Sequence, residues 1–173
     1  MFNVSPAAAA GERCRSAAEG VRVSEAERNK AVVRAFVAAV NAQDWGRVAR
    51  LVAPDFVRHS HAGGSPGVRS RDDLLRFLRG EFETFPDARE EIADMVAEGD
   101  RVAVRHCFRG TQAGPMGPYP PSGRVMAADY LAIYRLAGGA IAEAWAEWDN
   151  LSGLAQLGHH KHAAPGAAAD GGG

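Results

Sequence analysis

The chain has 173 residues, of which 46% are hydrophobic, and 20 basic against 21 acidic residues give it a formal net charge of −1. This length suits one domain with tails, because such a chain buries most of its apolar surface but is too short for two ordinary domains. The balanced charge excludes the concentrated basic face that nucleic-acid binding requires.

The cysteines and the chain ends indicate a reducing compartment and a single folded unit. Cys14 lies in an Ala- and Gly-rich arm and Cys107 in an apolar strand, which does not indicate a disulfide framework. No apolar run approaches the roughly 20 residues that cross a bilayer, so we expect a soluble, cytoplasmic protein without membrane contact. Residues 1–23 and 159–173 bury too little apolar surface to fold, which leaves a domain at 24–158 between disordered ends.

Helical signals dominate the first part of the domain. Ser24 and Glu27 form a capping box, and apolar residues then recur at helical spacing, so the pattern predicts a helix over Glu25–Asn41. Asp44 can cap a second, shorter helix, which Pro54 is expected to end because the residue before a proline is forced out of helical geometry.

A short strand and a third helix follow. Residues 55–61 are expected to form the strand, and the glycine- and proline-rich stretch at 63–67 a loop. Ser70 then begins a helix that carries Asp72 and Asp73 in its first turn, and Pro86 closes it.

The remainder of the domain alternates as strands do. Glycine turns separate four segments, which predicts an antiparallel meander over residues 89–98, 101–111, 125–136 and 140–148. The proline-rich loop at 112–123 joins the second and third strands and is placed to cover a pocket mouth. Helices followed by a curved sheet indicate the α+β class, with the helices on one face of the sheet.

Several segments, taken in order and at their spacing, resemble the SnoaL-like polyketide cyclases, a family that includes many proteins labelled ester cyclases. The similarity covers roughly residues 25–158 and rests on NKAVVRAF (29–36), APDFVRHS (53–60), AEGDRVAVR (97–105), PPSGR (120–124), YR (134–135) and QLG (156–158). It implies a cone-shaped, curved antiparallel sheet wrapped around N-terminal helices and enclosing a pocket, the ketosteroid-isomerase-like or nuclear transport factor 2-like fold.

The same resemblance implies a function, but the catalytic residues of the ring-closing members are absent from the matching positions of this chain. Family members catalyse ring closure or isomerisation of hydrophobic polyketide-type substrates without a cofactor, in secondary metabolism such as antibiotic biosynthesis. In the ring-closing cyclases an aspartate on the last strand takes a proton next to the ketone, and a histidine on the preceding strand assists. Anchored on Tyr134-Arg, Ile141 and QLG, these positions fall on Ala146 and Ala132, which cannot titrate.

Alternation along the last two strands separates two faces. By family analogy the Ala, Tyr and Trp face looks into the pocket, and Asp129 and Glu147 turn outward unless a bulge reverses them. Leu131, Ile133 and Trp145 would then form an apolar patch on the outer face, which predicts a homodimer or homotetramer.

Three residues are candidate catalytic groups. His59 lies on the early strand, where an imidazole suits acid/base work; the alternative is a partly exposed histidine bonded to the backbone. His106 lies mid-strand, either paired with Asp129 or Glu147 or simply packed. Glu147 serves proton transfer if buried and is an ordinary solvated acid if exposed. His59 and His61 lack a third metal ligand, so no metal site is predicted.

Five residues are candidate substrate contacts. Packing or solvation is the alternative role for each of them. They are His61, Tyr119, Asp129, Tyr130 and Trp148.

Three functions remain open at this level. The first is enolisation, ring closure or isomerisation of a small hydrophobic substrate. The second is epoxide opening, which needs an acid for the epoxide oxygen and a base for the nucleophile. The third is a non-catalytic binding or dimerisation module.

Overall fold

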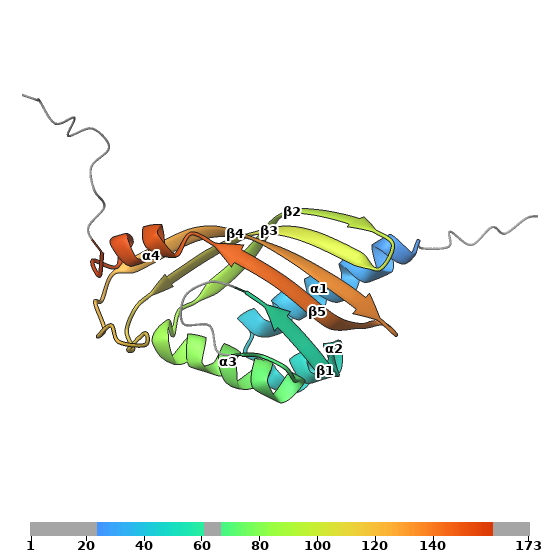
Figure 1. Cartoon of the computed structure of the whole chain (residues 1–173), viewed down its shortest axis with the longest axis horizontal. Helices are drawn as coiled ribbons and strands as arrows, with labels where there is room; N and C mark the ends of the chain where they lie inside the picture. The colour runs from blue at the N-terminus through green and yellow to red at the C-terminus, as the bar shows by residue number, and fades with distance from the viewer. Residues whose placement is uncertain (1–23, 61–66, 161–173) are drawn as a thin grey trace, which may run out of the picture.

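The computed structural model describes residues 24–60 and 67–160 (Figure 1). The predicted N-terminal arm, most of the C-terminal tail, His61 and most of the glycine loop lie outside the described residues. The elements run in the order α1 (Glu25–Asn41), α2 (Trp45–Leu51), β1 (Val52–His59), α3 (Arg71–Thr84), β2 (Arg89–Glu98), β3 (Arg101–Thr111), β4 (Val125–Ala137), β5 (Ala140–Trp148) and α4 (Asn150–Gln156).

Side-chain caps fix where the helices begin. Ser24 accepts a hydrogen bond from the Glu27 amide, and the predicted start of α1 is confirmed. Asp44, Ser70 and Asp149 cap α2, α3 and α4 in the same way. Such caps satisfy amide groups that have no partner within the helix.

The predicted junction between the second helix and the first strand is wrong, and that strand also ends at His59, before the predicted residue 61. The helix α2 ends at Leu51, and Val52 already belongs to β1, so Pro54 lies inside a strand instead of ending a helix. A proline is tolerated there because β1 is an edge strand whose pairing with β5 is irregular between Val52 and Val57.

The five strands form one sheet in the order β1-β5-β4-β3-β2. The strands β2 to β5 make the predicted antiparallel meander, whereas β1 pairs parallel with β5, so the sheet is mixed. The sheet arches over α1 and α3, and α4 lies at one end of it (Figure 1). This arrangement confirms the predicted α+β cone, although its two edges do not close into a barrel.

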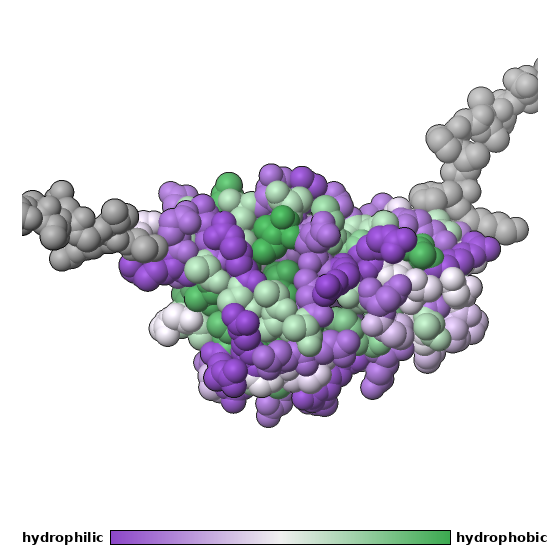
Figure 2. All heavy atoms as spheres, turned by 180° about the vertical axis from the view of Figure 1, so that it is seen from behind, coloured by the Kyte–Doolittle hydropathy of each residue, from purple (hydrophilic) through white to green (hydrophobic). Residues whose placement is uncertain are grey.

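The core fills most of the space beneath the sheet. The apolar stripe of α1, including Val33, Phe36 and Val40, is buried against the sheet, and Phe85 and Phe108 belong to a second cluster. The face of the molecule shown in Figure 2 has apolar atoms near its centre, framed by hydrophilic side chains. None of the helices in the described part of the chain is both long and apolar enough to span a membrane.

The proline-rich loop is tied to the segment that follows α4. Gln112 is fully buried; its side-chain amide donates to the Pro120 carbonyl oxygen (3.1 Å), and its Oε1 lies 2.8 Å from His159 Nε2. Tyr119 stacks on the His159 ring. No residue of this loop lines the cavity beneath the sheet.

Candidate functional site

The face of β4 and β5 that alternation assigned to the interior lines a cavity. Tyr130, Ala132 and Tyr134 contribute from β4, and Ala144, Ala146 and Trp148 from β5. Ala132 and Ala146 are direct partners in the β4–β5 ladder. The two positions that the family resemblance assigns to catalysis therefore stand side by side on the cavity wall and carry only methyl groups.

Three charged residues from other elements complete the cavity. Arg58 comes from β1, Glu81 from α3 and Glu90 from β2, and the remaining lining is largely aliphatic and aromatic. The cavity volume is about 80 Å³, which is small beside the roughly 300–1,000 Å³ of sites for drug-sized ligands. A molecule larger than this volume enters only when lining side chains move apart.

The environment of Glu81 strongly changes its protonation. Burial and, to a smaller extent, the nearby charge of Glu90 raise its pKa to about 8, and Arg58 opposes the change. The physical cause is that a carboxylate loses hydration in an apolar cavity and meets a like charge there. At neutral pH the Glu81 side chain is accordingly a neutral carboxylic acid and can donate a hydrogen bond.

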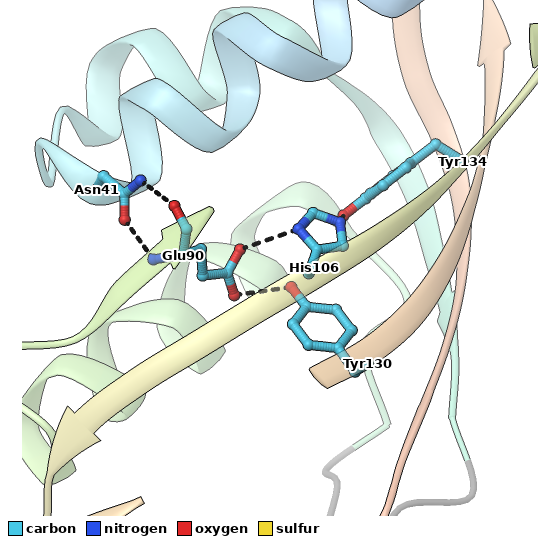
Figure 3. Close-up of polar contacts among 5 residues, drawn as sticks. All are labelled: Asn41, Glu90, His106, Tyr130 and Tyr134. Atoms are coloured by element: carbon cyan, nitrogen blue, oxygen red, sulfur yellow. Dashed lines mark hydrogen bonds and ion pairs between the residues drawn. The ribbon is translucent and has the colours of Figure 1, made fainter. Parts of the chain in front are cut away.

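Glu90 is held from two sides (Figure 3). The Asn41 side chain donates to the Glu90 carbonyl oxygen (2.7 Å) and accepts from its amide (2.9 Å), which fixes the backbone at the start of β2. The Tyr130 hydroxyl donates to Glu90 Oε1 at 2.8 Å. Burial raises the pKa of Glu90, while the Tyr130 hydrogen bond and Arg58 oppose that shift.

His106 lies behind the cavity wall. It is 0% exposed, and its ring stacks on Tyr130 with the centroids 4.5 Å apart. Its Nδ1 is 3.8 Å from Glu90 Oε2, within ion-pair range, but burial lowers the pKa of His106 to about 4. The imidazole is therefore neutral at physiological pH, and the pair is not a salt bridge.

The structure places His59 on the outer face of the sheet, away from the cavity lining. Its Nε2 is 3.1 Å from Glu143 Oε1. Its ring stacks on that of Trp145, which is the residue opposite His59 in the pairing of β1 with β5. Arg135 holds the other Glu143 oxygen at 2.7 Å, and this hydrogen bond, followed by that of His59, lowers the pKa of Glu143.

The other candidates divide between the two faces. Tyr130 and Trp148 line the cavity, and Trp148 Nε1 is buried without a hydrogen-bond partner among residues 24–60 and 67–160. Glu147 and Asp129 are exposed on the outer face, where Asp129 accepts from Arg105 at 3.0 Å. The pairing of His106 with Asp129 or Glu147 is therefore wrong, because these acids are on the opposite face.

Tyr119 belongs to the tied loop described above and does not line the cavity. His61 lies outside the described residues. Within the described ranges, no three His, Cys, Asp or Glu side chains converge in a way that could hold a metal ion.

Sequence reasoning missed Glu81 and Glu90, although each left a signal. Glu81 falls seven residues after the buried Leu74, on the apolar stripe of α3, where a carboxylate is out of place. Glu90 shares strand parity with Ile92, which packs against the core. An acid on an apolar face is a stronger indication of a site than an acid in an exposed row.

Comparison with known proteins places the chain in a family. The sequence model of the SnoaL-like polyketide cyclases matches residues 30–157. Among solved structures, IdmH from Streptomyces antibioticus, described as a candidate polyketide cyclase, is 34% identical, with a TM-score of 0.67, over 75% of this chain and 98% of its own.

Two further structures are similar over most of the domain. AclR from Streptomyces galilaeus, described as a candidate hydroxylase, is 28% identical over 77% of this chain and 97% of its own, with a TM-score of 0.67. A SnoaL-like protein from Jannaschia is 27% identical over 79% of this chain and 95% of its own, with a TM-score of 0.71. No curated protein matches the sequence.

Proposed function

Because this chain belongs to the SnoaL-like polyketide cyclase family, we propose that it is a cofactor-independent enzyme for acid/base chemistry on a hydrophobic, oxygenated small molecule. The observation that carries the proposal is the pair of carboxyl groups, Glu81 and Glu90, that share one apolar cavity. Environments that separate the protonation of two such groups provide an acid and a base at the same pH.

The two acids have different roles. Glu90 is the base, because the Tyr130 hydroxyl and Arg58 stabilise its negative charge. It removes a proton from the carbon next to a substrate carbonyl. Glu81, which keeps its proton at neutral pH, donates to the carbonyl oxygen as negative charge develops there.

This chemistry suits ring closure or isomerisation of a polyketide-type substrate in secondary metabolism, including antibiotic biosynthesis. The similarity to IdmH, described as a candidate polyketide cyclase, supports that substrate class. The apolar lining and the unpartnered Trp148 N–H favour an uncharged molecule with an acceptor oxygen.

Epoxide opening is the second candidate. The same two groups supply its requirements, since Glu81 would protonate the epoxide oxygen and Glu90 would activate water or an internal hydroxyl. The two reactions differ in their substrates and products, so they are separated by experiment.

Two small cyclic probes test these reactions. In D₂O, we expect the protein to accelerate deuterium incorporation next to the carbonyl of cyclohexanone, followed by NMR. Conversion of cyclohexene oxide to the diol would instead support the epoxide reaction. If both probes bind, as seen by shifted protein NMR signals, but neither reacts, the chain acts as a binding module and the enzyme proposal fails.

We also propose that the outer face of the sheet joins two copies of the chain. Val96, Leu131 and Ile133 are 68%, 63% and 40% exposed there, an apolar surface flanked by charges of both signs. Sedimentation should show a dimer or tetramer that Leu131→Glu dissociates. A wild-type monomer at high concentration would exclude this assembly.

A further inference from the structure

His106 lies between two residues that reach the cavity, although it does not line the cavity itself (Figure 3). On one side, its Nε2 is 3.0 Å from the Tyr134 hydroxyl oxygen. On the other side, its Nδ1 faces Glu90 Oε2 at 3.8 Å. The imidazole therefore spans from one cavity-lining group to another through the interior of the wall.

The two ring nitrogens are not equally satisfied. Nε2 has its hydrogen bond with Tyr134, whereas Nδ1 is buried and has no hydrogen-bond partner among the described residues. A neutral imidazole carries one N–H and one lone pair, and the position of the proton decides which nitrogen donates. Rotation of the Glu90 carboxyl that shortens the Nδ1 distance by roughly 0.6 Å would complete a hydrogen bond.

The charge of Glu90 selects the tautomer that fits. An ionised Glu90 accepts from Nδ1–H, and the Tyr134 hydroxyl then donates to the Nε2 lone pair. A protonated Glu90 donates to the Nδ1 lone pair, and Nε2–H then donates to the Tyr134 oxygen. In this second state the Tyr134 hydroxyl proton is turned away from His106 and is available to a ligand in the cavity.

From this geometry we infer that His106 relays a proton between Glu90 and Tyr134 by exchanging its two neutral tautomers. The inference rests on the proposed function, in which Glu90 is the base. His106 touches no substrate atom, so it is a positioning residue that acts through its two neighbours. Tyr134 becomes the group that delivers a proton to the substrate oxygen, while Glu81 keeps its own proton and donates a hydrogen bond to the same oxygen.

The proton transfers balance. The relay starts from the state with protonated Glu90 and Nε2–H. Glu90 passes its proton to Nδ1, Nε2 passes its own to the Tyr134 oxygen, and the Tyr134 hydroxyl proton bonds to the substrate carbonyl oxygen, which leaves Glu90 ionised and His106 in the Nδ1–H form. Glu90 then takes a proton from the neighbouring substrate carbon, and the electron pair of that C–H bond passes into the carbonyl system to give the enol. Glu90 and Tyr134 end with the protons they began with, and the reverse passage, as the enol returns to a ketone, restores the Nε2–H tautomer.

The surroundings of the ring favour tautomer exchange over ionisation. Tyr130 stacks on its face and also holds Glu90 Oε1, which keeps the carboxyl facing Nδ1. The other ionisable groups near Glu90 are Glu81 of α3 and Arg58 of β1, and both line the cavity. The two imidazole nitrogens face Glu90 and Tyr134, which are the two ends of the relay.

NMR of the protein labelled with ¹⁵N-histidine tests the relay without a substrate. Above about pH 5 we expect His106 to stay neutral, and we expect it to change from the Nε2–H to the Nδ1–H form as Glu90 ionises with rising pH. Glu90→Gln, whose amide donates permanently to Nδ1, should hold the Nε2–H form throughout. Glu143→Gln on the outer face should leave the change intact. A single fixed tautomer while Glu90 titrates, or a protonated imidazolium, would overturn the inference.

The rate of deuterium exchange into the cyclohexanone probe provides a second test of the relay. His106→Gln keeps groups that hydrogen-bond both neighbours but cannot exchange tautomers, and Tyr134→Phe removes the far end. If both belong to one relay, each variant loses a similar factor in exchange rate and the double variant loses little more. Losses that multiply would show independent roles and contradict the relay.

The two arms also separate this inference from the proposed function. A fixed tautomer together with an inactive Glu90→Gln variant overturns the relay and leaves Glu90 as the base. A tautomer that follows Glu90 in the wild type, together with a fully active Glu90→Gln variant, overturns the catalytic role of Glu90 and with it the relay's part in the reaction.

Discussion

Two histidine–carboxylate pairs lie on opposite faces of one sheet. The outer pair, His59 and Glu143, is the closer, at 3.1 Å, and Arg135 completes it as a solvated network. The inner pair, His106 and Glu90, is 3.8 Å apart and forms no hydrogen bond. The sequence marked both histidines as candidate catalysts, yet only the inner pair adjoins the cavity.

The comparison shows that loss of hydration, more than proximity, sets the chemistry of such a pair. On the outer face, hydrogen bonds lower the pKa of Glu143 and hold it as an ordinary carboxylate. On the inner face, burial raises the pKa of Glu90 and lowers that of His106, so both groups move toward neutrality. Proton transfer near neutral pH requires the second kind of environment.

The same substitution in both pairs gives the largest expected contrast. Glu90→Gln removes the base and should slow deuterium exchange into cyclohexanone by roughly 10²- to 10⁴-fold. Glu143→Gln should leave the rate within about twofold, because its carboxylate does not face the cavity. Equal losses in the two variants would remove the distinction between the faces.

The contributions of the buried Glu81 and of Glu143 on the outer face to the stability of the fold should change with pH in opposite directions. Glu81, with a folded-state pKa of about 8 against 4.5 normally, contributes stability that is complete below about pH 4.5 and is lost as the pH rises through 8. Glu143, whose pKa is lowered, contributes stability above its unfolded pKa that is lost as the pH falls.

Urea unfolding at several pH values measures this contrast. Glu81→Gln should reduce the decline in the free energy of unfolding between pH 4.5 and 8 by on the order of 2 kcal/mol. One pKa unit corresponds to about 1.4 kcal/mol, and the full shift is discounted because the side chain keeps some solvent contact. The Glu143→Gln variant is the control and should keep that decline. An unchanged slope in Glu81→Gln would mean that Glu81 is ionised in the folded protein.

Asn41→Ala tests the support of the inner carboxylate. It leaves the Glu90 amide and carbonyl without their partners, which should reduce the free energy of unfolding by about 1–2 kcal/mol and also slow the exchange reaction. Asn29→Ala is the matched control, because Asn29 lies on the same helix and donates to the Gly99 carbonyl. It should reduce stability alone, and a similar loss of rate there would point to a general effect of α1.

His59→Ala should have the smallest effect. The His59 side chain is 41% exposed, and such ion pairs contribute roughly 0.2–1 kcal/mol. Thermal unfolding should shift only slightly, and the exchange rate of the ketone probe should be unchanged. Strong inactivation by this substitution would restore His59 as a catalyst and place the site on the outer face.

Local signals were sufficient for most of the fold. Capping residues such as Ser24 and Ser70 gave the helix starts, and the glycine turn at Gly138 gave the last hairpin. The exception is the α2–β1 junction, because the tolerance of Pro54 in β1 depends on that strand lying at the sheet edge. Edge position is a property of the whole sheet and leaves no local mark in the sequence.

The site was less accessible from sequence because its groups come from separate elements. Alternation along β4 and β5, with the family resemblance to choose the inner face, identified Tyr130 and Trp148 as cavity residues, whereas a single alternation does not run through β2. The pairing of β2 with β3 shifts between Ile92 and Asp94, so the inward set passes from even to odd numbers. The meeting of Glu81 with Glu90 depends on how α3 docks under the sheet, which no spacing within the chain encodes.

The buried amide of Gln112 links the stability of two distant segments. Its backbone pairs with Arg124 and Gly123, while its side chain reaches Pro120 and His159. Neither the proline loop nor the turn after α4 can open without breaking bonds of the other, so both should unfold locally as one cooperative unit. Trimming the chain just before His159 would therefore loosen a loop some forty residues upstream, and this limits where a shortened version of the domain can end.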